Sequence, residues 1–270
     1  MLQIYILYIM QKILFIFNCH GGQIRKQIEH LPFLFDEIII YNYLLEGYPK
    51  DTLIYYDEND LEKIKNADIL IVQNVKNLRG KEFIGLDHIK TIVKSESKII
   101  KIPHYTFIGY FLSFDNNEKI DVNIYGTEEE IKTNFENSLE KIKILDEISD
   151  IKCYNFIKEN YKKYRLFHSK IYPTYHLFHF IAQEICKILG LESNIQKKYS
   201  NYANPNNQII FPNVQKYLEL EFNIIDFCYN CTIDEYLTIC KNLNINELYL
   251  FPKKKGRYQV KELENIRKYL

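Results

Sequence analysis

Short apolar runs that alternate with helical patterns constrain the fold of this 270-residue chain more than any other feature. Several of the runs are apolar on both faces, which is typical of strands buried between helices. Regular alternation of strand and helix favours a parallel sheet with helical crossovers. We therefore predict an α/β fold, a parallel sheet flanked by helices, with strands at 13–17, 37–41, 68–73 and 98–102 and helices at 23–30, 61–65 and 83–94.

The pattern changes after about residue 125, where longer helical spacings replace the short apolar runs. A threonine followed by three glutamates is typical of a helix start. We expect a core domain at 1–125 with the site at its strand ends, and a mainly helical C-terminal region at 126–270 that packs on or caps this core. The expected elements of that region are helices at 127–148, 150–164, 173–189, 233–243 and 260–269, with a loop at 193–212.

Polar residues follow three of the predicted strands at the point where each strand ends. Ligands of open parallel sheets bind beyond the carboxyl ends of the strands, so these residues mark a candidate site. They are Asn18, Cys19 and His20 after the first strand, Gln73 and Asn74 after the third, and His104 after the fourth.

Cys19 lies between a strand and a helical pattern, where the positive potential of a helix start lowers a thiol pKa and favours anions. The thiol could accept an acyl group, or it could shape the turn while a histidine deprotonates a hydroxyl. A small buried hydrophobe is the other interpretation of Cys19. Gly21 and Gly22 would let backbone N–H groups approach a pyrophosphate, although turn geometry alone also explains them.

The other candidate residues have equally open roles. His20, His104 and His168 could each accept a proton or simply pack in their loops. Gln73 and Asn74 could donate to an oxyanion or end their strand with a hydrogen bond. Arg79 could bind a phosphate or lie in an exposed basic loop.

Composition excludes several function classes. Lysine plus arginine equals aspartate plus glutamate at 35 each, so no overall field attracts nucleic acid, and we expect none as a partner. The six cysteines are scattered, which favours reduced thiols and a cytoplasmic location. Cys228 and Cys231 have the spacing of half a zinc site, but no second pair completes it, and we predict no metal.

The first seventeen residues are strongly apolar and could be mistaken for a membrane span. Gln3, Gln11 and Lys12 interrupt them, and a span needs about 20 apolar residues. We therefore predict an additional strand or a start-site extension at 1–9, with no stable membrane insertion.

Three blocks of the chain carry a resemblance to a known family, and they are Phe17–Gly21, Ala67–Val75 with Ile102–Phe111, and Leu166–Thr174. They resemble the WcbI family of capsular polysaccharide biosynthesis proteins, acetyltransferases that bind coenzyme A. The resemblance extends over residues 12–190, and two positions depart from the family pattern. His20 stands where the family usually has glutamine, and Tyr172 where it often has histidine before proline.

The resemblance implies an acyltransferase that moves an acetyl group from acetyl-coenzyme A to a sugar hydroxyl during polysaccharide or glycan biosynthesis. Catalytic roles would belong to Cys19, His20, His104 and His168, and contacts with coenzyme A to Asn18, Gly21, Gly22, Gln73, Asn74, Arg79 and Tyr172. The alternatives are an SGNH-like esterase or hydrolase, and a non-catalytic module that binds a glycan or a nucleotide.

Overall fold

The structure is a computed structural model, and it describes residues 11–17, 20–39, 56–74, 85–111, 127–191, 195, 210 and 212–222. Its first half alternates strands and helices, in the order β1 Lys12–Phe17, α2 His20–Ile28, β2 Leu34–Ile39, α4 Glu58–Asn66, β3 Ile69–Asn74, α5 Leu86–Ile92 and β4 Lys98–Pro103. The rest is mainly helical, with α6 Glu128–Glu147, α7 Tyr154–Asn160, β5 Phe167–Ser169, β6 Tyr172–Pro173, α8 Tyr175–Ile188 and α9 Pro212–Leu218.

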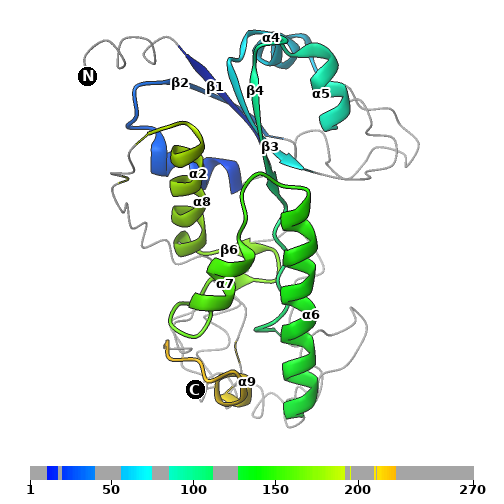
Figure 1. The fold of residues 1–270 in the computed structure, drawn as a ribbon, viewed down its shortest axis with the longest axis vertical. Helices are drawn as coiled ribbons and strands as arrows, with labels where there is room; N and C mark the ends of the chain where they lie inside the picture. The colour runs from blue at the N-terminus through cyan, green and yellow to red at the C-terminus, as the bar shows by residue number, and fades with distance from the viewer. Residues whose placement is uncertain are drawn as a thin grey trace, which may run out of the picture. The chain divides into compact units, whose positions relative to one another are not determined.

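The four long strands form one parallel sheet in the order β2-β1-β3-β4. The register places Ile16 of β1 opposite Val72 of β3, and Asn74 of β3 opposite Pro103 of β4. Helices pack on both faces of the sheet (Figure 1). The predicted α/β class, a parallel sheet flanked by helices, is confirmed.

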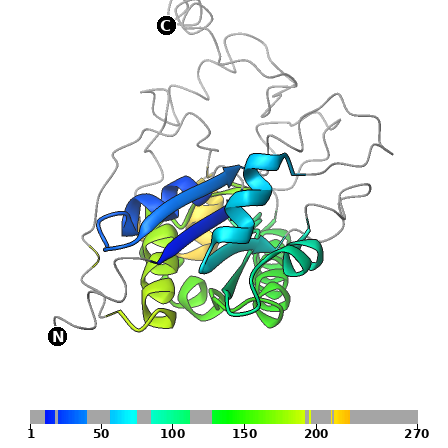
Figure 2. The same ribbon diagram turned by 90° about the horizontal axis from the view of Figure 1, so that it is seen from above.

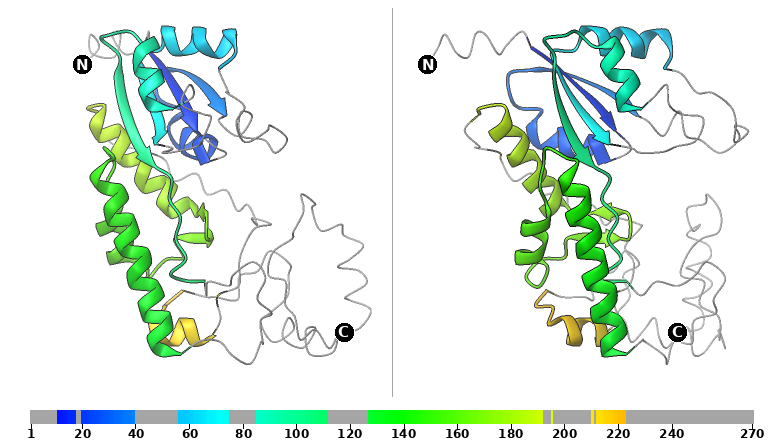
Figure 3. Two further views of the ribbon diagram at one scale, coloured as in Figure 1. Left: turned by 90° about the vertical axis from the view of Figure 1, so that its right-hand side faces the viewer. Right: turned by 45° about the vertical axis from the view of Figure 1, so that its right-hand side comes forward.

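The two faces of the sheet bury alternate residues of the same strands. Leu14 and Ile16 of β1 join a core cluster with α4 and α5 on one face. Phe17 points to the opposite face, where it meets the start of α2, and α2 packs against α8 there. Figures 2 and 3 show these two helix pairs on opposite sides of the strands.

Most predicted elements of the described part of the chain lie within a few residues of the observed ones. The chief difference is α2, which begins at His20, so the two glycines expected to precede the helix form its first turn. Helix α9 begins at Pro212, the last residue of the segment predicted as a loop. The predicted strand or extension at 1–9, the helices at 233–243 and 260–269, and the Cys228 and Cys231 pair lie outside the described residues.

The chain folds as two compact units, one of residues 1–105, 141–158 and 173–200, the other of 106–140, 159–172 and 201–270. The first contains the parallel sheet. The second has an aromatic core in which the Phe107 ring stacks on Phe167, with ring centroids 4.7 Å apart, and meets Phe135 edge-on. The boundary near residue 125 drawn from the sequence stays a prediction. Among the described residues, no helix is long and apolar enough to cross a membrane.

Candidate functional site

The carboxyl ends of β1, β3 and β4 meet at one rim of the sheet. Gln73 lies opposite Ile102, one position beyond the Ile16 and Val72 pair, so β3 ends level with β1. The chain leaves β1 toward β2 on one side, whereas β3 and β4 lie on the other. Such a reversal of strand order is where ligands of open α/β sheets bind. Of the polar residues expected there, the described ones are His20, Gln73 and His104, which lie at or next to these strand ends.

His20 and His104 form a stacked pair at this rim. Their ring centroids are 5.9 Å apart and their planes differ by only 6°. The Phe178 ring of α8 lies against His20 at 5.7 Å. His20 is only 5% exposed, whereas His104 is partly exposed. The structure thus brings together two imidazoles that the sequence places after different strands.

The residues that follow β4 hold His104 in place. The Tyr105 hydroxyl donates a 2.8 Å hydrogen bond to Cys153 Sγ, and both side chains are buried. The Cys153 N–H in turn donates to Asp146 Oδ1 at 3.0 Å. Burial raises the pKa of both Tyr105 and Cys153, so each stays protonated at neutral pH. Cys153 is therefore a structural residue rather than a nucleophile.

The first turn of α2 lies beside the rim and is built from the two glycines. A Cβ at Gly21 would lie 2.4 Å from Phe17 Cβ, so only glycine lets the helix approach β1 this closely. A Cβ at Gly22 would meet no atom within 4 Å. A small hollow of about 90 Å³ lies here, between Gly22, Phe15 and Glu37. Open space therefore lies beside Gly22 in this first turn, and a helix start favours an anionic or carbonyl oxygen.

Burial keeps both histidines of the stack uncharged at neutral pH. It lowers the pKa of His20 to about 3, with a smaller contribution from the nearby His104. Burial also lowers the pKa of His104. A neutral imidazole can accept a proton, but one as deeply buried as His20 is a weak base. The more exposed His104 is the better placed of the two to accept a proton.

The buried state of His20 predicts a loss of stability in acid. In the unfolded chain a histidine titrates near about 6.5, so below that pH the unfolded state binds a proton that folded His20 excludes. The stability due to neutral His20 is complete above about pH 6.5 and falls until the pH reaches the folded pKa of about 3. The loss between pH 6.5 and pH 5 is about 2 kcal/mol.

Urea unfolding measured across this pH range tests that loss. The His20→Gln variant is the control, because its side chain has no proton to gain. As the pH falls, the free energy of unfolding of the natural protein should decrease more steeply than that of the variant. The difference in slope should correspond to the uptake of about one more proton on unfolding. Equal slopes would show that His20 is not held neutral by the fold.

Of the remaining candidates, Gln73 lies in the first unit, two lie in the second unit and the others are at undescribed positions. His168 and Tyr172 both belong to the second unit, where their ring centroids lie 6.4 Å apart. Gln73 is 3% exposed at the end of β3. Asn18, Cys19, Arg79 and the Asn74 side chain lie outside the described part of the structure. The described residues contain no cluster of side chains that could hold a metal ion.

Sequence reasoning did not find the contribution of α8. Its aromatic residues predict a buried helix face, but nothing in their spacing indicates that Phe178 packs on His20. The same holds for the Tyr105 and Cys153 bond, which joins residues 48 positions apart. Neither contact has a local pattern, so only the folded chain reveals them.

Comparison with known proteins finds a solved structure with a similar fold. No family model and no curated protein matches the sequence. A solved structure of WcbI matches with a TM-score of 0.50 and 13% identity, over 79% of this chain and 82% of that one. It is described as a polysaccharide biosynthesis enzyme, in its native form without a disulfide bond between coenzyme A and one of its cysteines. This likeness supports the α/β architecture.

A second solved structure matches less well. It is a manganese-bound variant of a periplasmic metal-binding protein from Candidatus Liberibacter asiaticus, with a TM-score of 0.23 and 18% identity. The match covers 56% of this chain and 51% of that chain. A TM-score this low supports no inference.

Proposed function

We propose that the protein is an acyltransferase that moves an acetyl group from acetyl-coenzyme A to a sugar hydroxyl in polysaccharide or glycan biosynthesis. The observation that carries this proposal is the neutral His20 and His104 stack at the rim where β1, β3 and β4 end. The fold is similar to that of WcbI, a polysaccharide biosynthesis enzyme described together with coenzyme A. This likeness supports the class of donor and acceptor.

The residues of the rim fit the parts of such a donor. The accessible first turn of α2 at Gly22 suits the diphosphate, because backbone N–H groups at a helix start favour negative charge. The hollow beside it is lined by Phe15 and Phe17, which suits an apolar portion of the ligand. Acetyl-coenzyme A supplies an activated acetyl group as a thioester. The other contacts that the resemblance implies from this unit, by Asn18, Asn74 and Arg79, are part of the same proposal.

His104 is the proposed general base. It would take the proton of the acceptor hydroxyl while the oxygen attacks the acetyl carbon, and it is neutral and partly exposed as that role requires. The carbon–sulfur bond of the thioester would then break, and coenzyme A would leave as a thiol after taking the proton from His104. His20 holds the His104 ring by stacking and is a positioning residue. The Gln73 amide, at the end of β3, would donate to the carbonyl oxygen as charge develops there. Cys19 would either carry the acetyl group or shape the turn.

Isothermal titration with acetyl-coenzyme A and with coenzyme A tests the proposal directly. Both should give a saturable isotherm with one site per chain, whereas ATP, which lacks the pantetheine arm, should bind more weakly. If neither coenzyme A nor acetyl-coenzyme A binds at millimolar concentration, the proposal is wrong. Turnover of a chromogenic ester without coenzyme A, lost in Cys19→Ala, would favour the hydrolase instead.

A further inference from the structure

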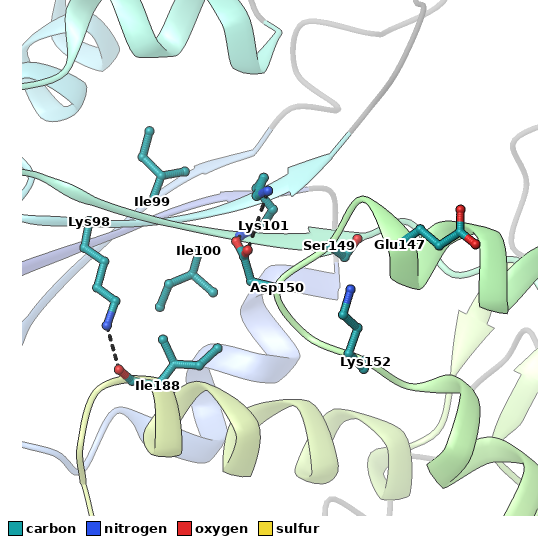
Figure 4. Close-up of a pocket in the computed structure, with 9 residues that line it drawn as sticks. All are labelled: Lys98, Ile99, Ile100, Lys101, Glu147, Ser149, Asp150, Lys152 and Ile188. Carbon is teal, nitrogen blue, oxygen red and sulfur yellow. Dashed lines mark hydrogen bonds and ion pairs between the residues drawn. The ribbon is translucent and has the colours of Figure 1, made fainter.

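A second concave surface lies along the outer edge of the sheet, within the first unit. It is a groove of about 540 Å³ between β4, the end of α8 and the segment that follows α6 (Figure 4). Among the described strands β4 is the last of the sheet, so one side of its backbone faces this groove. No residue of the groove belongs to the rim described above. We call it the β4 groove, and its key residues are Lys98, Ile99, Ile100, Lys101, Lys152 and Ile188.

Part of the β4 edge is already paired, and this shows which backbone groups point outward. The Lys101 N–H donates to Asp150 Oδ2 at 2.7 Å, and the Asp150 N–H donates back to the Lys101 carbonyl at 2.9 Å. The Lys98 N–H points the other way, to the carbonyl of Asp68 before β3. Backbone groups alternate along a strand, so those of Ile99 point outward like those of Lys101.

Ile99 lines the groove with its backbone rather than its side chain. Its side chain packs against the core cluster on the α4 and α5 face of the sheet. Figure 4 draws the Ile99 and Ile100 side chains on opposite sides of β4, with Ile100 turned toward Ile188 of α8. The groove therefore combines an outward peptide edge at Ile99 with an apolar floor formed by the partly exposed Ile188 beside the buried Ile100.

Three lysines and two acids line this edge, so its net charge is +1. Lys98 donates to the Ile188 carbonyl at 2.6 Å, which holds its ammonium group in place without neutralising it. Lys152 donates to the Asp146 carbonyl and also favours the charged form of the Asp146 carboxylate. Lys101 lies 3.5 Å from the Asp150 carboxylate, and Glu147 is the second acid of the lining. Three lysines thus face two acids along one short stretch of strand edge.

We propose that the β4 groove binds an extended acidic peptide segment of a partner protein by β-strand addition. The segment would exchange backbone hydrogen bonds with Ile99, as an added strand does at an open sheet edge. One apolar side chain would lie on Ile100 and Ile188, and flanking carboxylates would meet Lys98 and Lys152. Alternation of apolar and acidic residues is the sequence pattern that this arrangement selects.

Fluorescence anisotropy with the full chain tests this proposal, and the probe is a labelled peptide of alternating glutamate and valine. The decisive comparison is Ile99→Pro against Ile99→Ala. Both variants lose the same core packing, but only proline removes the outward N–H, and an edge strand tolerates it. The acidic peptide should bind with saturation, and about 3- to 10-fold more weakly to the proline variant than to the alanine variant. Lys152→Gln should weaken binding several-fold, as should added salt.

Hydrogen exchange can be measured on the natural protein, so its result does not depend on whether a variant folds. The acidic peptide should slow exchange of the Ile99 amide, while a peptide of alternating lysine and valine should leave it unchanged. Equal affinity of the proline and alanine variants would overturn the proposal. Equal binding of the lysine peptide, or no binding of the acidic one, would also overturn it.

Discussion

Replacing His104 by glutamine should reduce acetyl transfer by about 10²- to 10⁴-fold, the usual contribution of a general base. Glutamine keeps the size and hydrogen-bonding capacity of the side chain but cannot accept the proton. Binding of acetyl-coenzyme A should change little, because the first turn of α2 is untouched, so the effect should fall on kcat. Steady-state kinetics together with titration of the donor separate these two quantities.

His30→Gln is the matched control, because His30 is an exposed histidine beyond the end of α2. This variant should keep full activity. His20→Gln should show an intermediate loss, since it weakens the stack without removing the proposed base. Full activity in His104→Gln, with the protein folded by circular dichroism, would contradict the assignment of His104.

Exchanging the two glycines of α2 for alanine should give opposite effects on stability. Gly21→Ala places a methyl group 2.4 Å from Phe17 Cβ and 2.9 Å from its Cγ, where backbone and a buried strand residue leave little room. Overpacking of this kind destabilises by about 1–3 kcal/mol. Gly22→Ala meets no atom within 4 Å and gains up to about 1 kcal/mol of helix propensity.

Urea unfolding of the two variants measures this difference. The gap in the free energy of unfolding between Gly22→Ala and Gly21→Ala should be about 1–3 kcal/mol, the cost of overpacking. Both variants change the same residue type in the same helical turn, so solvent and propensity effects cancel in the comparison. Equal stabilities would mean that α2 can move away from β1, and that Gly21 does not fix the rim.

The fold was predictable because its signals are local. Apolar runs such as that of β1, in which five of six residues are buried, indicate buried strands on their own. The alternation of these runs with helices then limits the topology to a parallel sheet. The position of His20 and His104 at one rim follows from this topology, because both come directly after strands. That part of the site required no knowledge of side-chain contacts.

The contacts that complete the site are not local, and the sequence gives no sign of them. The start of α2 at His20 was missed because two glycines ordinarily disfavour a helix. Here the close approach of Gly21 to Phe17 outweighs that preference. Likewise, the depth at which His20 is buried depends on Phe178, far along the chain in α8. Packing between distant segments, rather than local propensity, determines the chemistry of this histidine.

A crystal structure of the protein in complex with coenzyme A tests the central claim most directly. The account predicts the sulfur at the rim, in contact with His104 and Cys19, and the diphosphate at the first turn of α2. Coenzyme A bound away from the ends of β1, β3 and β4, with the His20 and His104 stack untouched, would contradict it.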